Sequence, residues 1–150
     1  MTDVEIRRAG RADLAALARL RREQAAEQRG EYGDPGFEER FAAWQEREAA
    51  RRITWLAEVD GRLVGMMNLA IFERMPRPGR PASYWGYLAN AFVLAGYRNQ
   101  GIGRLLLDAV LGYGRQHGFA RVALSPSDRS VPFYRRAGFG PAGALLLWTP

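Results

Sequence analysis

The sequence contains no cysteine, no lysine and a single histidine, His117. Without cysteine the chain can form no disulfide, thiolate nucleophile or thiolate metal site, and one histidine cannot build a polyhistidine metal site. The absence of lysine excludes a Schiff-base lysine and also the Walker phosphate loop, which requires that residue. We therefore expect no metal, and a chemistry that comes from other side chains or from a cofactor.

Long hydrophobic runs are also lacking. No run reaches the ~18 apolar residues of a membrane span, and the stretch "MTDVEIRRAGRAD" has no apolar centre typical of a secretory signal. The sequence therefore predicts a soluble, cytoplasmic protein with no membrane partner. Of its 150 residues, 47% are hydrophobic. A chain of this size is typical of one compact domain, which we assign to residues 1–150.

Acidic residues are fewer than basic ones, at 16 against 22, and the net charge is +6. This surplus favours polyanions such as nucleic acid, acidic surfaces or phosphorylated small molecules, although an all-arginine bias also follows from genomic composition. The arginines are spread along the chain. No basic helix with interleaved aromatics and no zinc or RNA motif indicates a nucleic-acid-binding protein, so we expect no nucleic-acid partner.

The pattern of apolar residues predicts an α/β fold with about six to seven strands and four helices. Asp60-Gly61 lies between two runs of β-forming residues and predicts a hairpin, and the proline-rich stretch 74–83 predicts a loop. No internal repeat or linker divides the chain. Strands are expected at 4–9, 53–59, 62–73, 84–94, 120–125 and 144–150, and helices at 13–28, 34–50, 101–117 and 128–137.

The stretch "VLAGYRNQGIGRLL", residues 93–106, joins an apolar strand to an amphipathic helix that begins at its glycines. A helix start presents about four unpaired N–H groups, and glycine lets an anion approach them. Arg98 and Arg104 flank the turn, so the pattern predicts phosphate binding. Leu106 stands where a Rossmann loop requires glycine, which argues against a dinucleotide site. A tight turn without a ligand is the alternative.

The segment Arg98-Asn99-Gln100-Gly101-Ile102-Gly103 fits the pattern R/Q-x-x-G-x-G/A and resembles the pyrophosphate loop of the GNAT superfamily of acyl-CoA-dependent N-acetyltransferases. A second stretch, "SDRSVPFYRRAGF" at 127–139, resembles the later strand and helix of that family, with its tyrosine and terminal glycine-phenylalanine. The order of the expected elements agrees over nearly the whole chain. The resemblance implies a GNAT-like fold, with a mixed and mostly antiparallel central sheet, and acetyl-CoA as the co-substrate.

The resemblance also implies roles for individual residues. The pyrophosphate would lie on the amides of the loop, while amides on a splayed strand polarise the thioester carbonyl. Tyr134 corresponds to the family tyrosine that protonates the departing thiolate. Ser127 stands where many members carry an asparagine that bonds pantetheine, and Ser130 lines the same channel or caps a helix. The implied acetyl-CoA contacts are Phe92, Val93, Leu94, Arg98, Asn99, Gln100, Gly101, Ile102, Gly103, Arg104, Ser127, Ser130 and Tyr134.

The group that deprotonates the acceptor amine is harder to assign. No carboxylate occurs between Ser83 and Leu94, where many family members place a glutamate base. The catalytic candidates beside Tyr134 are Glu73, which we rank first, and Asn90, with Tyr87 to orient water or substrate. His117 lies at a helix end, where a cation complements the dipole, and is interpreted as structural.

The resemblance implies an N-acetyltransferase that moves the acetyl group from acetyl-CoA to a primary amine. With no cysteine to carry the acetyl group, transfer would be direct, in a ternary complex. The acceptor is unidentified; its site should involve the loops 27–37 and 74–83, which vary in this family. A non-catalytic acyl-CoA-binding sensor or regulatory module is the alternative, because the strand glutamate is missing. The apolar stretch "ALLLW" predicts an edge strand that pairs two copies into a homodimer.

Overall fold

The computed structural model describes residues 3–31 and 33–150. At its centre is a five-stranded sheet in the order β1-β2-β3-β4-β5. The strands from β1 to β4 are antiparallel to their neighbours, and β5 runs parallel to β4. The sheet is therefore mixed and mostly antiparallel, as expected. The strands are β1 (Val4–Arg8), β2 (Arg52–Val59), β3 (Arg62–Glu73), β4 (Tyr84–Val93) and β5 (Val122–Ala123).

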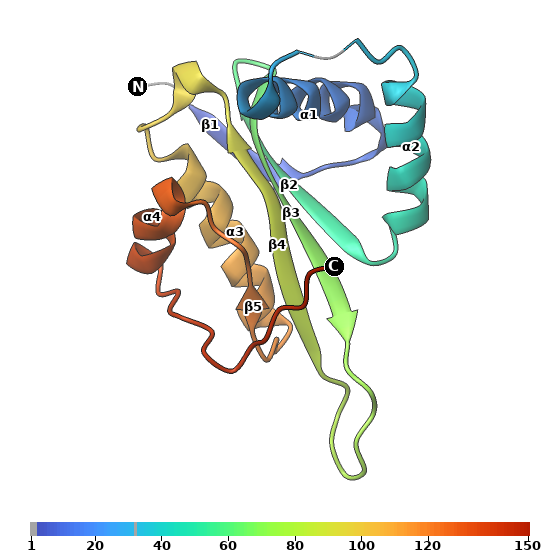
Figure 1. Ribbon diagram of the computed structural model, residues 1–150, viewed down its shortest axis with the longest axis vertical. Coiled ribbons are helices and arrows are strands. Elements are labelled where there is room, and N and C mark those ends of the chain that lie inside the picture. The colour runs from blue at the N-terminus through green and yellow to red at the C-terminus, as the bar shows by residue number, and fades with distance from the viewer. Residues whose placement is uncertain (1–2, 32) are drawn as a thin grey trace.

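The four expected helices are confirmed, and they cover both faces of the sheet. On one side lie α1 (Leu14–Arg29) and α2 (Phe37–Glu48), and on the other α3 (Ile102–Gln116) and α4 (Val131–Arg136) (Figure 1). Short 3-10 turns at Arg11–Asp13, Ala95–Tyr97 and Asp128–Ser130 lead into α1, the loop before α3, and α4. Because helices cover the sheet on both sides, both faces of β3 are buried. This explains why its residues are apolar almost without interruption.

The core lies between α3 and the sheet and continues under α1. Leu17 and Leu20 of α1 and Leu106 and Val110 of α3 are almost fully buried, at the three- and four-residue spacing that predicted these helices. The hairpin between β2 and β3 turns at Asp60 and Gly61, which have φ angles of 49° and 76°. The Asp-Gly pair tolerates this left-handed backbone, so the sequence predicted the turn correctly.

The expected number of strands was too high. The described residues form five strands rather than six to seven, because residues 144–150 form no strand and β5 is shorter than expected. Apolar content alone does not make a strand, since the backbone needs a neighbouring strand to pair with. In this segment Leu145 N–H donates to Ala142 O at 3.1 Å, which closes a turn. Leu146 and Trp148 are 100% and 81% exposed.

Candidate functional site

The first feature of the site is the point where β4 and β5 separate. The two strands pair only at Gly86 with Val122 and Tyr87 with Ala123. Just beyond these pairs, the Tyr87 hydroxyl donates to Ser125 Oγ at 3.1 Å. β4 continues for six more residues to Val93, with β3 on one side and no described strand on the other. The resulting edge of β4 carries backbone groups that a ligand can reach.

A β-bulge at Asn90 determines which backbone groups face this open edge. Before the bulge, Gly86 N–H points toward β5 and donates to Arg121 O at 3.0 Å. Peptide groups alternate along a strand, so Leu94, eight residues on, would point the same way in a regular strand. Instead Leu94 N–H donates to Val64 O of β3 at 2.8 Å. The extra residue opposite Met67 reverses the alternation, and Asn90 there has a φ of 54°.

This geometry corrects part of the expected set of amides. The Leu94 amide is used by β3, and Phe92, two residues before it and paired with Met66, faces the same way. Val93 lies between them and points its peptide toward the open edge. Its carbonyl accepts Arg98 Nε at 2.8 Å, which agrees with that direction. Of Phe92, Val93 and Leu94, only Val93 therefore presents its N–H to the opening.

The turn before α3 has the geometry expected of an anion site. Gly101 immediately precedes the helix in a left-handed conformation, with φ 84°, and Asn99 has φ 61°. The first helical bond runs from Leu105 N–H to Gly101 O at 3.1 Å. The N–H groups of Ile102, Gly103 and Arg104 precede the first helical donor, Leu105 N–H, and lie at the positive end of the dipole. Gly103 also lies close to Phe133, whose ring is 3.4 Å from where a Cβ would be.

The two arginines of the turn have different surroundings. Arg98 donates Nε to Val93 O and Nη2 to Glu27 Oε2 of α1, at 2.8 and 2.6 Å. Arg98 therefore ties the turn to β4 and α1, a structural role that the sequence analysis did not foresee, and its contact with acetyl-CoA stays a prediction. Glu27 was not found from the sequence. The Arg104 side chain is half-exposed and pairs with Asp108 one turn along α3 at 2.9 Å, so it remains accessible beside the helix start.

Tyr134 lies on α4, on the same side of the sheet as α3, and is 9% exposed. Its ring meets those of Phe133 and Phe139 edge to face, with centroids 5.0 and 5.6 Å apart. Burial raises the pKa of the Tyr134 hydroxyl above 10. The group therefore stays protonated at neutral pH, as a proton donor must. In the turn before α4, Ser127 Oγ donates to Ser130 Oγ at 3.1 Å, so these two side chains lie together.

Asn90 borders a cavity of about 170 Å³ between α1, α2 and the sheet. Its neighbour there, Asn68 of β3, is 5% exposed and donates to Thr54 Oγ1 at 2.7 Å. Asn68 Oδ1 accepts from Arg52 Nη1 at 2.8 Å. The sequence analysis missed Asn68, although a single asparagine within the apolar run "GMMNLAIF" was a signal. The cavity is lined by Leu17, Arg21, Phe37, Phe41, Trp44, Gln45, Thr54, Met66, Asn68 and Asn90.

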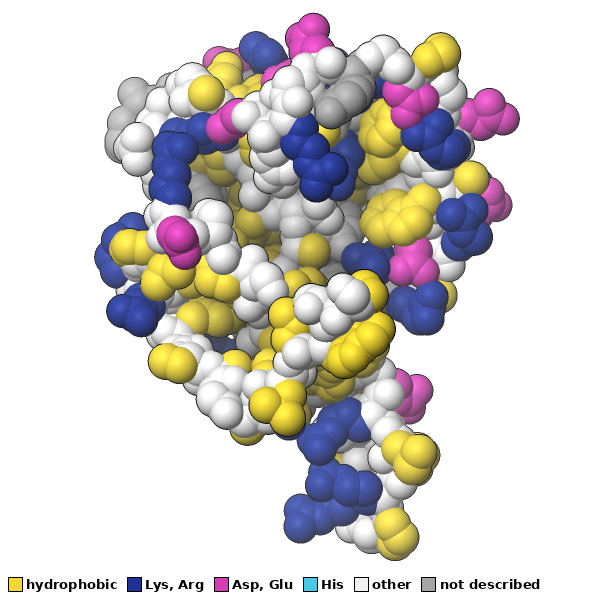
Figure 2. Space-filling model, in the orientation of Figure 1, with side chains coloured by type: hydrophobic (Ala, Val, Ile, Leu, Met, Phe, Trp, Pro, Cys, Tyr) yellow, Lys and Arg dark blue, Asp and Glu magenta, His cyan; other side chains and the backbone are white. Residues whose placement is uncertain are grey.

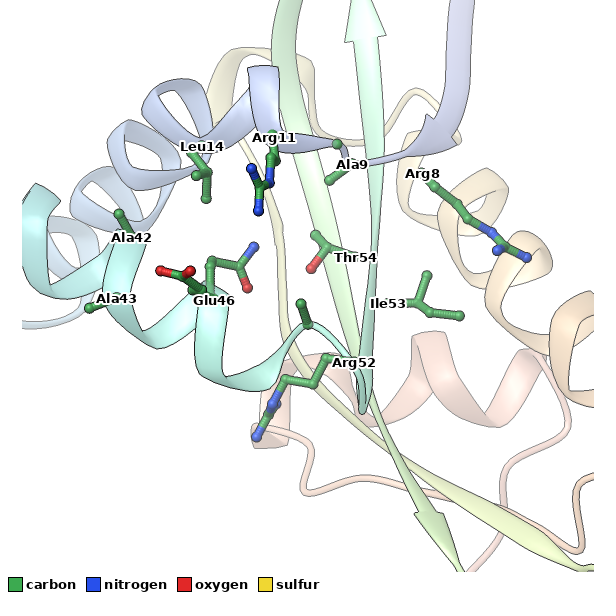
Figure 3. Close-up of a pocket in the computed structure, with 13 residues that line it drawn as sticks. Arg8, Ala9, Arg11, Leu14, Ala42, Ala43, Glu46, Arg52, Ile53 and Thr54 are labelled. Atoms are coloured by element: carbon green, nitrogen blue, oxygen red, sulfur yellow. The ribbon is translucent and has the colours of Figure 1, made fainter.

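A larger cavity of about 670 Å³ adjoins it, with Gln45 and Thr54 in both linings (Figure 3). It lies between α2, the start of β2 and the Arg11–Asp13 turn. Arg8 extends away from it toward α3, where its guanidinium lies 5.0 Å from the Tyr113 ring. Both cavities thus lie under α2, on the side of the sheet opposite α3.

The structure does not bring Glu73 into this site. Glu73 is exposed at the end of β3 and pairs with Tyr84, which is six residues before Asn90 on β4. Six strand residues span about 20 Å. Glu73 therefore lies too far from Asn90 to take a proton there, which corrects its first rank. His117 is exposed at the end of α3 and stacks on Tyr113, with ring centroids 3.9 Å apart, also outside the site.

The two loops expected near the acceptor have different positions. The proline-rich loop 74–83 projects from the far end of the β3–β4 hairpin, and basic side chains gather on it (Figure 2). It lies beyond Glu73 and away from the β4 opening. The loop 27–37 joins α1 to α2; Tyr32 within it lies outside the described residues. The loop 27–37 leads directly into α2, whose side chains line both cavities.

Comparison with known proteins assigns the family. The profile of the Acetyltransferase (GNAT) family matches residues 17–139, and the chain belongs to this family. A glucosamine 6-phosphate N-acetyltransferase of Trypanosoma brucei brucei is 34% identical over 79 residues, 53% of this chain and 52% of that protein. The matched region thus spans about half the length of this relative. In the described part of the chain, no helix has the length and apolar character needed to cross a membrane.

Solved structures agree in fold over the whole chain. A predicted acetyltransferase of Clostridium acetobutylicum with acetyl-CoA has a TM-score of 0.79 and 18% identity, covering 98% of this chain and 96% of that one. The aminoglycoside N-acetyltransferase AAC(6')-Iy in complex with CoA has a TM-score of 0.76 and 21% identity, covering 100% and 96%. At these identities the likeness shows the GNAT fold.

Proposed function

We propose that the protein is an N-acetyltransferase that moves an acetyl group from acetyl-CoA directly to a primary amine in a ternary complex. The observation that carries the proposal is the opening between β4 and β5. The Val93 amide faces it, and the amides of Ile102, Gly103 and Arg104 lie at the nearby start of α3. The Val93 amide would stabilise the oxygen of a thioester carbonyl, and the amides at the start of α3 would bind a pyrophosphate.

In the proposed reaction, the amine nitrogen attacks the thioester carbonyl carbon, and Val93 N–H donates to the oxygen as it gains charge. The carbon–sulfur bond then breaks, and the Tyr134 hydroxyl gives its proton to the sulfur. The proton lost by the amine passes to a water held beside Asn90, because no carboxylate is present among the described residues that line the smaller cavity. Bulk water returns a proton to Tyr134, so the enzyme ends unchanged.

The acceptor side of the reaction is assigned to the cavities under α2. The relatives named above act on amines, glucosamine 6-phosphate in one case and aminoglycosides in another. In this chain, Asn90 is at once part of the smaller cavity and the bulge that directs Val93 toward the opening. The cavity lies on the α1 and α2 side of the sheet, and α3 lies on the other side (Figure 1). An amine in the cavity would therefore approach the thioester from the face of β4 that is turned away from α3.

Calorimetry with acetyl-CoA, followed by thiol release in the presence of primary amines, tests this proposal. We expect saturable binding and acetyl-CoA-dependent thiol release that requires an amine. Binding without thiol release for any amine would support the alternative of an acyl-CoA-binding sensor. No binding of acetyl-CoA would contradict both functions.

We also propose that two copies of the chain form a homodimer through residues 144–150. This segment is exposed and apolar, and β5 at the end of the sheet leaves one edge without a described partner. A second copy would cover the side chains and could supply the strand partner that this segment lacks. Light scattering should give twice the 16.8 kDa chain mass. Replacing Leu146 and Trp148 together by serine should give a monomer of unchanged helical content.

A further inference from the structure

The cavity beside Asn90 has an aromatic wall formed by one side of α2. Phe37, Phe41 and Trp44 follow one another along α2, with ring centroids 5.8 and 6.1 Å apart. All three rings line the cavity, and no residue of α2 is fully buried. The apolar side of α2 therefore lines a space of about 170 Å³, with Phe41 also packed against the core. A cavity of roughly 150 Å³ is large enough for one benzene-sized ring.

The wall opposite the aromatic rings is polar but carries no negative charge. Thr54, Asn68 and Asn90 provide neutral groups, and no carboxylate is present among the described residues that line the cavity. A site for a polycationic amine would need carboxylates to offset the desolvation of each positive charge. The cavity is therefore poorly suited to an acceptor with several positive charges.

One charged side chain, Arg21 of α1, lines the cavity. Its Nη1 donates to Gln24 Oε1 at 2.9 Å, and Gln24 is itself 5% exposed. This bond orients the guanidinium and leaves four of its five N–H donors for other acceptors. By contrast, Arg52 nearby is already engaged by Glu48 and Asn68, at 2.7 and 2.8 Å. Arg21 is thus the guanidinium with capacity to bind an anion here.

From these features we infer the chemical class of the acceptor: a small primary amine that bears one flat apolar ring and one anionic group. The ring would pack against Phe41 and Trp44, the carboxylate or phosphate would bind Arg21, and the amine would lie at Asn90. This inference rests on the proposed acetyltransferase function and adds the substrate class. It separates the chain from the aminoglycoside-modifying neighbour, whose substrates are polycations.

A matched set of acceptors tests the inference. L-phenylalanine has ring, amine and carboxylate; phenethylamine lacks the carboxylate, and L-alanine lacks the ring. The phosphonate analogue of phenylalanine distinguishes a site for phosphate from one for carboxylate, and spermidine and kanamycin represent polycations. We expect kcat/KM for L-phenylalanine or its phosphonate to exceed the value for every other probe by about tenfold or more. Spermidine or kanamycin as the best acceptor would overturn the inference.

Variants of α1 identify the anion site. Arg21→Gln should lower kcat/KM at least tenfold more for L-phenylalanine than for phenethylamine. Arg19→Gln removes an exposed arginine from the same helix and should leave both values unchanged. Equal losses on both acceptors in Arg21→Gln would show that Arg21 acts on the fold and would contradict the assignment.

The failure of the inference can be told apart from that of the proposed function. If acetyl-CoA binds but no amine is acetylated, calorimetry with L-phenylalanine and its phosphonate in the presence of CoA still examines the cavity. Saturable binding that Arg21→Gln abolishes would then support the ligand class while contradicting catalysis. Absence of binding by both probes would overturn the inference, whatever the activity on other amines.

Discussion

The Glu27 carboxylate of α1 lies 2.6 Å from Nη2 of Arg98, at the start of the turn before α3, although the two residues are 71 positions apart in the chain. The same guanidinium donates to Val93 O at 2.8 Å. The pair therefore joins α1, the turn and the end of β4. The hydrogen bond from the Arg98 guanidinium lowers the pKa of the Glu27 carboxyl below its ordinary value, so Glu27 is ionised at neutral pH.

Glu27→Gln should weaken acetyl-CoA binding modestly, because the turn loses its tie to α1 while its backbone amides remain. Both side chains are partly exposed, and such pairs contribute about 0.2–1 kcal/mol, so affinity should fall about two- to fivefold by calorimetry. Arg98→Gln should have a similar effect. Glu38→Gln, which breaks the Arg22 pair between α1 and α2, is the control. A much larger loss for Arg98→Gln than for Glu27→Gln would indicate direct phosphate contact by Arg98.

Gly101→Glu should abolish acetyl-CoA binding in a folded protein. The substitution places a carboxylate where the helix start should receive phosphate, and it strains a left-handed residue. Gly118→Glu is a close control, because Gly118 follows the other end of α3 with φ 65° and no atom near its Cβ position. Both variants should lose similar stability on thermal unfolding, and only Gly101→Glu should lose binding. Retained affinity in Gly101→Glu would refute the phosphate assignment.

Tyr134→Phe should lower kcat by roughly 10²- to 10⁴-fold with little change in acetyl-CoA affinity, because the hydroxyl matters mainly as sulfur gains charge. The ring contacts with Phe133 and Phe139 do not involve the hydroxyl, so stability should barely change. Because burial raises the pKa of the Tyr134 hydroxyl above its ordinary value, the alkaline decline of wild-type activity should lie at higher pH than an exposed tyrosine would give. Tyr113→Phe, on α3, is the control. Single-turnover rates equal to wild type would remove Tyr134 from the mechanism.

Asn90→Val should impair the thioester step more than Asn90→Gly. Glycine accepts the φ of 54° and preserves the bulge, whereas a β-branched residue resists it and favours a regular strand, which would turn Val93 away from the opening. The measurements are kcat and the hydrogen exchange of the Val93 amide.

Glu73→Gln should leave kcat unchanged, since Glu73 lies at the far end of β3. A large loss of kcat in Glu73→Gln would restore it as a base.

The pairing of Asp13 with Arg7 predicts how stability depends on pH. Nη2 of Arg7 lies 2.8 Å from Asp13 Oδ1, and Gly10 N–H donates to Asp13 Oδ2 at 2.7 Å. These bonds lower the pKa of Asp13 to about 2. Because the folded-state pKa is depressed, its contribution is complete above the unfolded value of 3.8 and is lost as pH falls toward 2. Asp13→Asn should flatten the thermal stability profile in that window; an unchanged profile would contradict this role.

Much of the fold could be predicted from local patterns. The Asp60-Gly61 turn, the α3 start at Gly101 and the spacing of Leu106 and Val110 depend on backbone preferences and on burial of one helix face. These signals lie within a few residues of one another. The prediction of a final strand was wrong because a strand depends on a distant partner. The stretch "ALLLW" has the composition of a strand but pairs with no strand of the chain's own sheet.

For the site, the sequence alone was enough to locate the glycine turn before α3, to single out Tyr134 and to show that no carboxylate lies near Asn90 on its strand, because each depends on residue type at short spacing. Tertiary contacts were needed to show that Glu27 holds Arg98, that Val93 rather than Phe92 or Leu94 faces the opening, and that Glu73 lies remote. The tertiary structure also brought Arg21, Trp44 and Asn68 around one cavity. These relationships depend on strand register, on one bulged residue and on helices crossing the sheet, which are non-local contacts that no short stretch of sequence encodes.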